Sequence, residues 1–141
     1  MERRGIVIAL CVTAGLSGGV ALAQTKGGSP EARKVKNPVA SAPASITAGE
    51  QLYTKNCAFC HGPKALGDGP LAPKDIKPSN LTDAQWDYGS TDGEIFAVIM
   101  NGTTPKTAMV AVKGRLSDTD VWNLVNYIRS IGPKAPKGGT R

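Results

Sequence analysis

Two cysteines and a histidine form the densest group of reactive side chains in this sequence. Cys57 and Cys60 are separated by two residues, and His61 follows directly. This spacing is typical of the c-type haem attachment motif. Two thiols at this separation can form thioethers with the two vinyl groups of a haem, and the adjoining imidazole can ligate the iron. The motif therefore predicts one haem c, bound covalently through Cys57 and Cys60.

Three other kinds of site also use paired cysteines. A thiol–disulfide redox pair has the same spacing, but it usually begins a helix in a βαβ setting, and no segment here alternates convincingly as a strand. A zinc site needs about four ligands, whereas the chain has one histidine and three cysteines, one of which, Cys11, lies in the N-terminal apolar segment. A plain disulfide gives no reason for the adjoining histidine. Haem attachment uses all three residues, whereas a zinc site would need carboxylates to complete its ligand set.

The chain contains no second histidine, so a methionine is the natural second axial ligand of the iron. Met109 lies in a segment predicted to be irregular, 103–115, where a loop can carry a ligand to the side opposite His61. Met100 falls in a predicted helix, where methionine commonly fills the core. We expect Met109 to be the ligand, with Met100 or an open or water-bound site as the alternatives.

Helix-capping patterns and apolar periodicity predict three main helices. They are expected from Ala48 to about Asn56, from the capping box of Thr91 and Glu94 to a stop at Asn101–Gly102, and from Asp118 to Ile131. A short helix is also expected within 81–88. Glycine and proline punctuate the segment 62–80, which should form a long loop, as should 103–115. The sequence therefore predicts an all-α fold with two long loops.

Both ends of the chain differ in composition from its middle. Residues 1–23 have the basic start and the uncharged apolar stretch of a secretory signal peptide, with cleavage expected after Ala23. An uncleaved membrane anchor is the alternative. Residues 24–45 are rich in Gly, Pro, Ser and Ala and are predicted to be a flexible linker. Residues 134–141 are predicted to be a basic disordered tail, which leaves 46–133 as the folded domain.

The net charge of +6 belongs to the ends of the chain. Residues 24–45 carry four basic side chains and one acidic side chain, whereas 46–133 carry eight basic and nine acidic ones. A near-neutral domain argues against a nucleic-acid partner. The basic ends could still provide weak association with an acidic membrane surface or with a larger complex.

Several short motifs occur in an order that resembles the class I c-type cytochromes. Over residues 46–132 the chain is similar to small bacterial monohaem cytochromes and to the cytochrome-oxidase subunit III type domain. The segments that carry the resemblance are Cys57–Gly62, Gly67–Pro70, Lys77–Thr82, Ile99–Gly102, Thr107–Met109 and Leu116–Trp122. The resemblance implies the cytochrome c fold, in which three main helices and long loops wrap around one covalently bound haem.

The resemblance also implies roles for individual residues. Cys57 and Cys60 would form the thioethers, His61 would be the proximal ligand and Met109 the distal one. Pro70, in the Gly-Pro pair after the motif, would offer its carbonyl oxygen to the other nitrogen of the histidine ring, which fixes its tautomer.

Further roles concern the packing around the haem. Gly49 and Tyr53 of the first main helix would cross Leu124 and Tyr127 of the last one, with glycine allowing the backbones to approach closely. Trp86 could bond a haem propionate or pack on the haem edge. The family often has proline directly after the axial methionine, and this chain has valine there.

The implied function is that of a periplasmic electron carrier with one haem ligated by histidine and methionine. Such a protein is not an enzyme; it exchanges single electrons with a redox protein donor and acceptor, and it is expected to be a monomer. Two alternatives stay open. One is a haem protein with an open sixth position, a peroxidase or gas sensor. The other is the cytochrome subunit of a larger dehydrogenase or oxidase complex.

Overall fold

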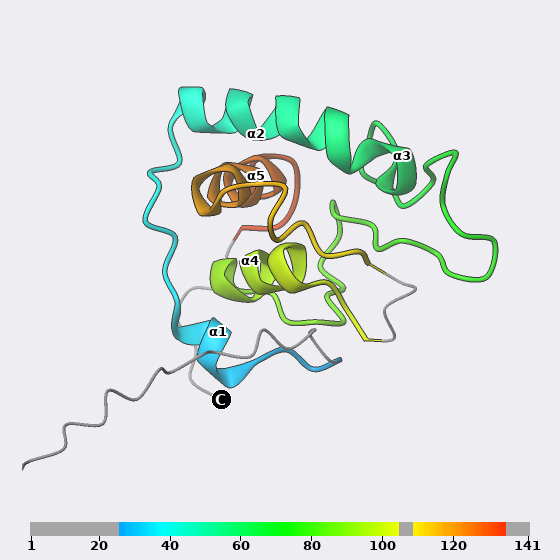
Figure 1. Cartoon of the computed structure of the whole chain (residues 1–141), viewed down its shortest axis with the longest axis horizontal. Coiled ribbons are helices and arrows are strands. Elements are labelled where there is room, and N and C mark those ends of the chain that lie inside the picture. The colour runs from blue at the N-terminus through cyan, green and yellow to red at the C-terminus, as the bar shows by residue number, and fades with distance from the viewer. Residues whose placement is uncertain (1–25, 105–108, 135–141) are drawn as a thin grey trace, which may run out of the picture.

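A computed structural model describes residues 26–104 and 109–134, and these ranges contain five helices and no strand (Figure 1). The helices are α1 (Pro30–Lys34), α2 (Pro43–Asn56), α3 (Ala58–His61), α4 (Asp92–Asn101) and α5 (Asp118–Ile131). The predicted all-α fold is confirmed. The predicted signal peptide, residues 135–141 of the predicted tail, and Thr107 and Ala108 lie outside the described residues. No described helix combines the length and the apolar character that a membrane span requires.

Helices α4 and α5 begin at the capping boxes that the sequence predicts. At α4, Glu94 N–H donates to the Thr91 hydroxyl at 3.3 Å, and Thr91 N–H donates to the Glu94 carboxylate at 3.0 Å. Ser117 and Asp120 make the same reciprocal pair of bonds at α5. These bonds satisfy N–H groups that have no partner within the helix, so the local sequence alone defines where both helices start.

Two predicted features of the helices are wrong. Helix α2 begins at Pro43 instead of Ala48, because proline fits the first helical turn, where its missing N–H costs nothing. The predicted short helix within 81–88 is absent. There the Asn80 side chain accepts hydrogen bonds from the N–H and the hydroxyl of Thr82, at 2.9 and 2.7 Å, and such local bonds compete with a helix.

Helix α2 lies across α5, and their crossing forms the centre of the core (Figure 1). A Cβ atom on Gly49 would overlap the carbonyl oxygen of Asn123 and lie 2.7 Å from the Cβ of Tyr127. The rings of Tyr53 and Tyr127 pack at 5.3 Å between centroids. The close backbone approach expected at Gly49 is therefore confirmed. Buried side chains from three helices surround it: Tyr53, Ile95, Ile99, Val121, Leu124, Val125 and Ile128.

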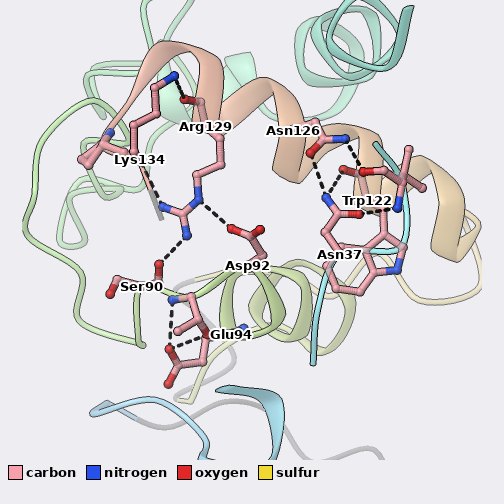
Figure 2. Close-up of polar contacts among 11 residues, drawn as sticks. Asn37, Ser90, Asp92, Glu94, Trp122, Asn126, Arg129 and Lys134 are labelled. Atoms are coloured by element: carbon pink, nitrogen blue, oxygen red, sulfur yellow. Dashed lines mark hydrogen bonds and ion pairs between the residues drawn. The ribbon is translucent and has the colours of Figure 1, made fainter. Parts of the chain in front are cut away.

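The segment 26–45 differs from the flexible linker that its composition predicts. We call residues 26–42 the N-terminal strap; it contains α1 and packs along α4 and α5 (Figure 1). The Asn37 side chain donates to the Asn126 side chain of α5 at 2.8 Å (Figure 2). The Asn126 amide in turn donates to the Ser45 hydroxyl at 2.8 Å and to the Val39 carbonyl oxygen at 3.1 Å. The strap has few apolar residues, and its polar groups instead satisfy buried polar groups of the domain.

A second polar contact fastens the strap to α4. The Glu94 side chain is only 1% exposed, and Arg33 donates to it through Nε and a terminal nitrogen, both at 3.1 Å. Burial alone would raise the pKa of Glu94. The hydrogen bonds from Thr91 and the charge of Arg33 outweigh burial, so the pKa lies below its ordinary value. The ionised form of Glu94 is therefore part of the folded structure.

This contact predicts a pH-dependent stability. A carboxylate whose pKa is lower in the folded state stabilises that state above its unfolded pKa of about 4.3, and the contribution is lost as the pH falls through the folded pKa. We expect Glu94→Gln to lower the free energy of unfolding at pH 7 by about 2 kcal/mol, because it removes the charge paired with Arg33. Urea unfolding of the haem-loaded protein from pH 7 to pH 3 tests this.

Glu31 is an exposed carboxylate in α1 and provides the matched control. Glu31→Gln should unfold within about 0.5 kcal/mol of the unmodified protein at every pH. The difference between Glu94→Gln and the unmodified protein should shrink toward acid pH. A difference that stays constant with pH would contradict the role given to Glu94.

Candidate haem-attachment site

The cysteine–histidine motif lies where α2 gives way to the single turn of α3. Cys57 N–H donates to the Tyr53 carbonyl oxygen at 2.8 Å and so ends α2. The amides of Cys60 and His61 both donate to the Cys57 carbonyl oxygen, at 3.1 and 2.9 Å. The two thiols and the imidazole are therefore carried by one short helical turn. Both cysteines are unpaired and half-buried.

The Cys57 thiol is protonated at neutral pH. Burial raises its pKa to about 11, the nearby Cys60 acts in the same direction, and the positive charge of Arg115 opposes them. Arg115 thus lies near enough to Cys57 to interact with it electrostatically. Arg115 belongs to the segment between Met109 and α5, so this segment passes near the motif.

The histidine ring is oriented by a backbone carbonyl group, but not by the one expected. His61 Nδ1 lies 3.0 Å from the carbonyl oxygen of Ser79. Pro70, for which the resemblance implied this role, is exposed. The amides on either side of Pro70 both donate to carbonyl oxygens of α3, Gly69 to that of Cys60 at 3.1 Å and Leu71 to that of Phe59 at 2.8 Å. The prediction for Pro70 is therefore wrong.

The loop itself explains why Ser79 takes this place. Leu81 N–H donates to the Ala65 carbonyl oxygen at 2.8 Å, which folds the end of the loop back onto its beginning. This contact brings the residues just before Leu81 next to His61. No signal in residue type could have identified Ser79, because its backbone oxygen makes the contact and its side chain has no part in it.

The charge state of His61 suits a metal ligand. Burial lowers the pKa of the ring, and the hydrogen bond with Ser79 only partly offsets this effect. A neutral ring that donates through Nδ1 presents the lone pair of Nε2 for coordination. None of the hydrogen bonds among the described residues uses Nε2.

The two candidate methionines have different surroundings. Met100 is 9% exposed and belongs to the hydrophobic core beside α5, which agrees with a packing role. Met109 is half-buried, and its backbone is bonded to Thr103, two residues beyond the end of α4. Ligation of the iron by Met109 stays a prediction.

Trp86 packs against the core, and its ring lies beside the buried Arg129. The guanidinium carbon of Arg129 is 5.8 Å from the ring centroid. The same guanidinium donates to Asp92 at 2.7 Å and also to the carbonyl oxygen of Ser90 (Figure 2). The contact seen at Trp86 is thus with this cation, and its bond to a propionate stays a prediction.

The residues present fit a covalently bound haem. Two unpaired thiols, a neutral oriented imidazole and a thioether are the donor set that haem c uses. Exposed apolar side chains accompany this set; Phe59 and Leu71 lie in and after the motif, and Val110 follows Met109. Within the described residues, no group of three or more His, Cys, Asp or Glu side chains is placed to hold another metal.

An all-helical fold with this motif on one turn defines a c-type cytochrome domain. Residues 44–128 match the model of the family described as cytochrome c oxidase, cbb3-type, subunit III, and the chain belongs to this family. Membership implies a covalently bound haem c with its iron, and the spacing of Cys57 and Cys60 agrees with it.

Individual relatives differ in how much of their length the match covers. The chain is 34% identical over 85 residues to the cbb3-type cytochrome c oxidase subunit FixP of Bradyrhizobium sp. (strain ORS 278), which is 60% of this chain and 27% of that protein. It is 33% identical over 85 residues to cytochrome c6 of Diacronema lutheri, which is 60% of this chain and 94% of that protein. The chain thus spans about a quarter of FixP and almost all of cytochrome c6.

A solved structure supports the same fold. Cytochrome cL from Hyphomicrobium denitrificans superimposes with a TM-score of 0.54 and 25% sequence identity, over 76% of this chain and 65% of that one. The helical arrangement around the motif is therefore that of a c-type cytochrome, as the resemblance implied.

Proposed function

We propose that this chain carries single electrons between redox proteins in the periplasm as a monohaem c-type cytochrome. The observation that carries the proposal is the placement of both thiols and the imidazole on one helical turn, with His61 oriented by the Ser79 carbonyl oxygen. The haem, when bound, supplies an iron that gains and loses one electron. The family match, together with relatives such as cytochrome c6, supports a carrier and not an enzyme.

His61 and Met109 are the proposed axial ligands. The bond from His61 Nδ1 to Ser79 holds the ring plane and raises the basicity of Nε2. A methionine thioether favours the reduced iron and therefore gives a higher potential than a second histidine would. Cys57 and Cys60 attach the haem, so the carrier keeps its cofactor during repeated encounters.

The proposed partners are a protein electron donor and a protein electron acceptor. The exposed apolar side chains at the motif, Phe59 and Leu71, offer a small surface for short-lived contacts. The near-neutral domain implies docking that depends little on salt, nothing in it favours nucleic acid, and a monomer is the proposed state. The apolar segment 6–23 behind Arg3 and Arg4 supports export to the periplasm, with an uncleaved anchor as the alternative.

A second candidate is a subunit of a respiratory oxidase complex. The family match and the name of FixP favour it, since FixP is a subunit of a cbb3-type cytochrome c oxidase. Purification from native membranes separates the two, because a subunit elutes with the oxidase and a shuttle elutes alone.

Met109→Ala tests the distal ligand. We expect this variant to lose the Met-to-iron charge-transfer band of the oxidised spectrum and its reduced form to bind carbon monoxide at the vacated position. Met100→Leu is the matched control, because Met100 is buried in the core and leucine keeps its volume. It should retain the band. A band that persists in Met109→Ala, or is lost only in Met100→Leu, would contradict the assignment.

A further inference from the structure

We propose that Thr103 is the positioning residue that holds Met109 in place as the axial ligand; the inference rests on the ligation proposed above. Thr103 and Met109 bond to each other twice. Met109 N–H donates to the Thr103 hydroxyl at 3.0 Å, and Thr103 N–H donates to the Met109 carbonyl oxygen at 3.1 Å. Thr103 is 2% exposed, so both bonds are shielded from water at that residue. We call this pair of bonds the Thr103–Met109 clasp.

The clasp is fixed to the rigid end of α4. Gly102 ends the helix with its N–H donating to the Val98 carbonyl oxygen at 2.8 Å and a φ of +73°, which glycine adopts without strain. A Cβ on Gly102 would lie 2.5 Å from the Met109 carbonyl oxygen. The backbone of Met109 thus lies directly against the helix end, with no room for a side chain between them.

The chain is also held beyond Met109. Val112 N–H donates to the Ile99 carbonyl oxygen and Lys113 N–H to that of Met100, both at 3.1 Å. These bonds satisfy carbonyl groups in the last turn of α4, and Val112 is 5% exposed. The chain is therefore held at Met109 by the clasp and again at Val112 and Lys113 by the last turn of α4. Of these attachments, the bond from the Met109 amide to the Thr103 hydroxyl is the one made by a side chain, so it can be removed by substitution.

A fixed backbone matters because an axial thioether is a weak ligand that an external ligand can replace. Residues that orient a metal ligand tune how tightly it binds. Thr103→Val keeps the size and branching of the side chain and the backbone bond, but it leaves the Met109 N–H without its acceptor. Met109 should then leave the iron more readily, while its chemical identity as the ligand is unchanged.

The experiment measures how fast imidazole displaces the methionine from the oxidised haem-loaded protein. Thr103→Val should react about tenfold faster than the unmodified protein, the factor that corresponds to one hydrogen bond of about 1.4 kcal/mol. Thr103→Ser keeps the hydroxyl and should react at nearly the unmodified rate. As the pH is raised, Thr103→Val should also lose the charge-transfer band at a lower pH than Thr103→Ser and the unmodified protein.

A Thr103→Val rate equal to the unmodified one would overturn the clasp while leaving Met109 as the ligand. Retention of the charge-transfer band in Met109→Ala would instead show that the ligation is wrong, and the clasp with it. A third readout needs no variant: the Met109 amide should be protected from hydrogen exchange to a degree comparable with that of Val112. Rapid exchange at Met109 alone would also overturn the proposal.

Discussion

The double variant Cys57→Ser, Cys60→Ser is expected to hold no haem under denaturing conditions. Serine keeps the size of both side chains, but its hydroxyl does not form the thioether bond of haem c. Each single variant should retain haem through the remaining thiol. The measurement is haem staining of a denaturing gel with protein expressed alongside the attachment machinery.

The domain should be less stable when no haem is bound. Only 5% of the residues are aromatic, so few large side chains are present to fill a core without the porphyrin. The double variant should lose a large part of its helical signal. Phe59→Ala alters an exposed residue between the two cysteines and should attach haem normally. Haem that survives denaturation in the double variant would show that attachment does not use these thiols.

Gly49→Val is expected to destabilise the domain by more than about 3 kcal/mol, a large fraction of the 5–15 kcal/mol that is typical of domains. A Cβ at this position overlaps the Asn123 carbonyl oxygen and lies close to the Cβ of Tyr127. Because these are backbone and near-backbone atoms, rotation of a side chain cannot relieve the overlap, and α2 must move away from α5. Urea unfolding followed by circular dichroism measures the loss.

Gln51 is exposed on the same helix and serves as the control. Gln51→Ala should change the free energy of unfolding by no more than about 0.5 kcal/mol. Gly49→Ala should also lower the free energy of unfolding, but by less than Gly49→Val, since it adds only one methyl group. A valine variant as stable as the Gln51 control would mean that the helices do not cross as closely as described.

Local chemistry explains which parts of the fold were predictable from sequence. The starts of α4 and α5 follow from Thr91 and Ser117, whose side chains bond within their own first turns. The same kind of pattern misled at the predicted helix start at Ala48. Thr47 and Glu50 have the spacing of a capping box, but they lie inside a helix that Pro43 has already begun. Composition misled over the N-terminal strap, since its partners on α5 and α4 are far away in sequence.

Some residues of the candidate site were likewise predictable from sequence, and others were not. The motif residues follow from their spacing, and the preference for Met109 over Met100 follows from the position of Met100 in a helix. The partner of His61 could not be predicted, because a carbonyl oxygen belongs to every residue and its location depends on how the loop folds back. The bonds between Thr103 and Met109 join residues six positions apart and outside the helices, where no spacing rule predicts a contact.

The N-terminal strap also limits how far the domain can travel from a point of attachment. A flexible linker of about 22 residues would allow an end-to-end distance of about 26 Å. Because residues 26–42 are fastened to α4 and α5 through Arg33 and Asn37, they add nothing to that reach. Figure 1 shows α1 and α3 at opposite corners of the view. The fastened strap would therefore keep the domain close to any attachment made through the N-terminal residues.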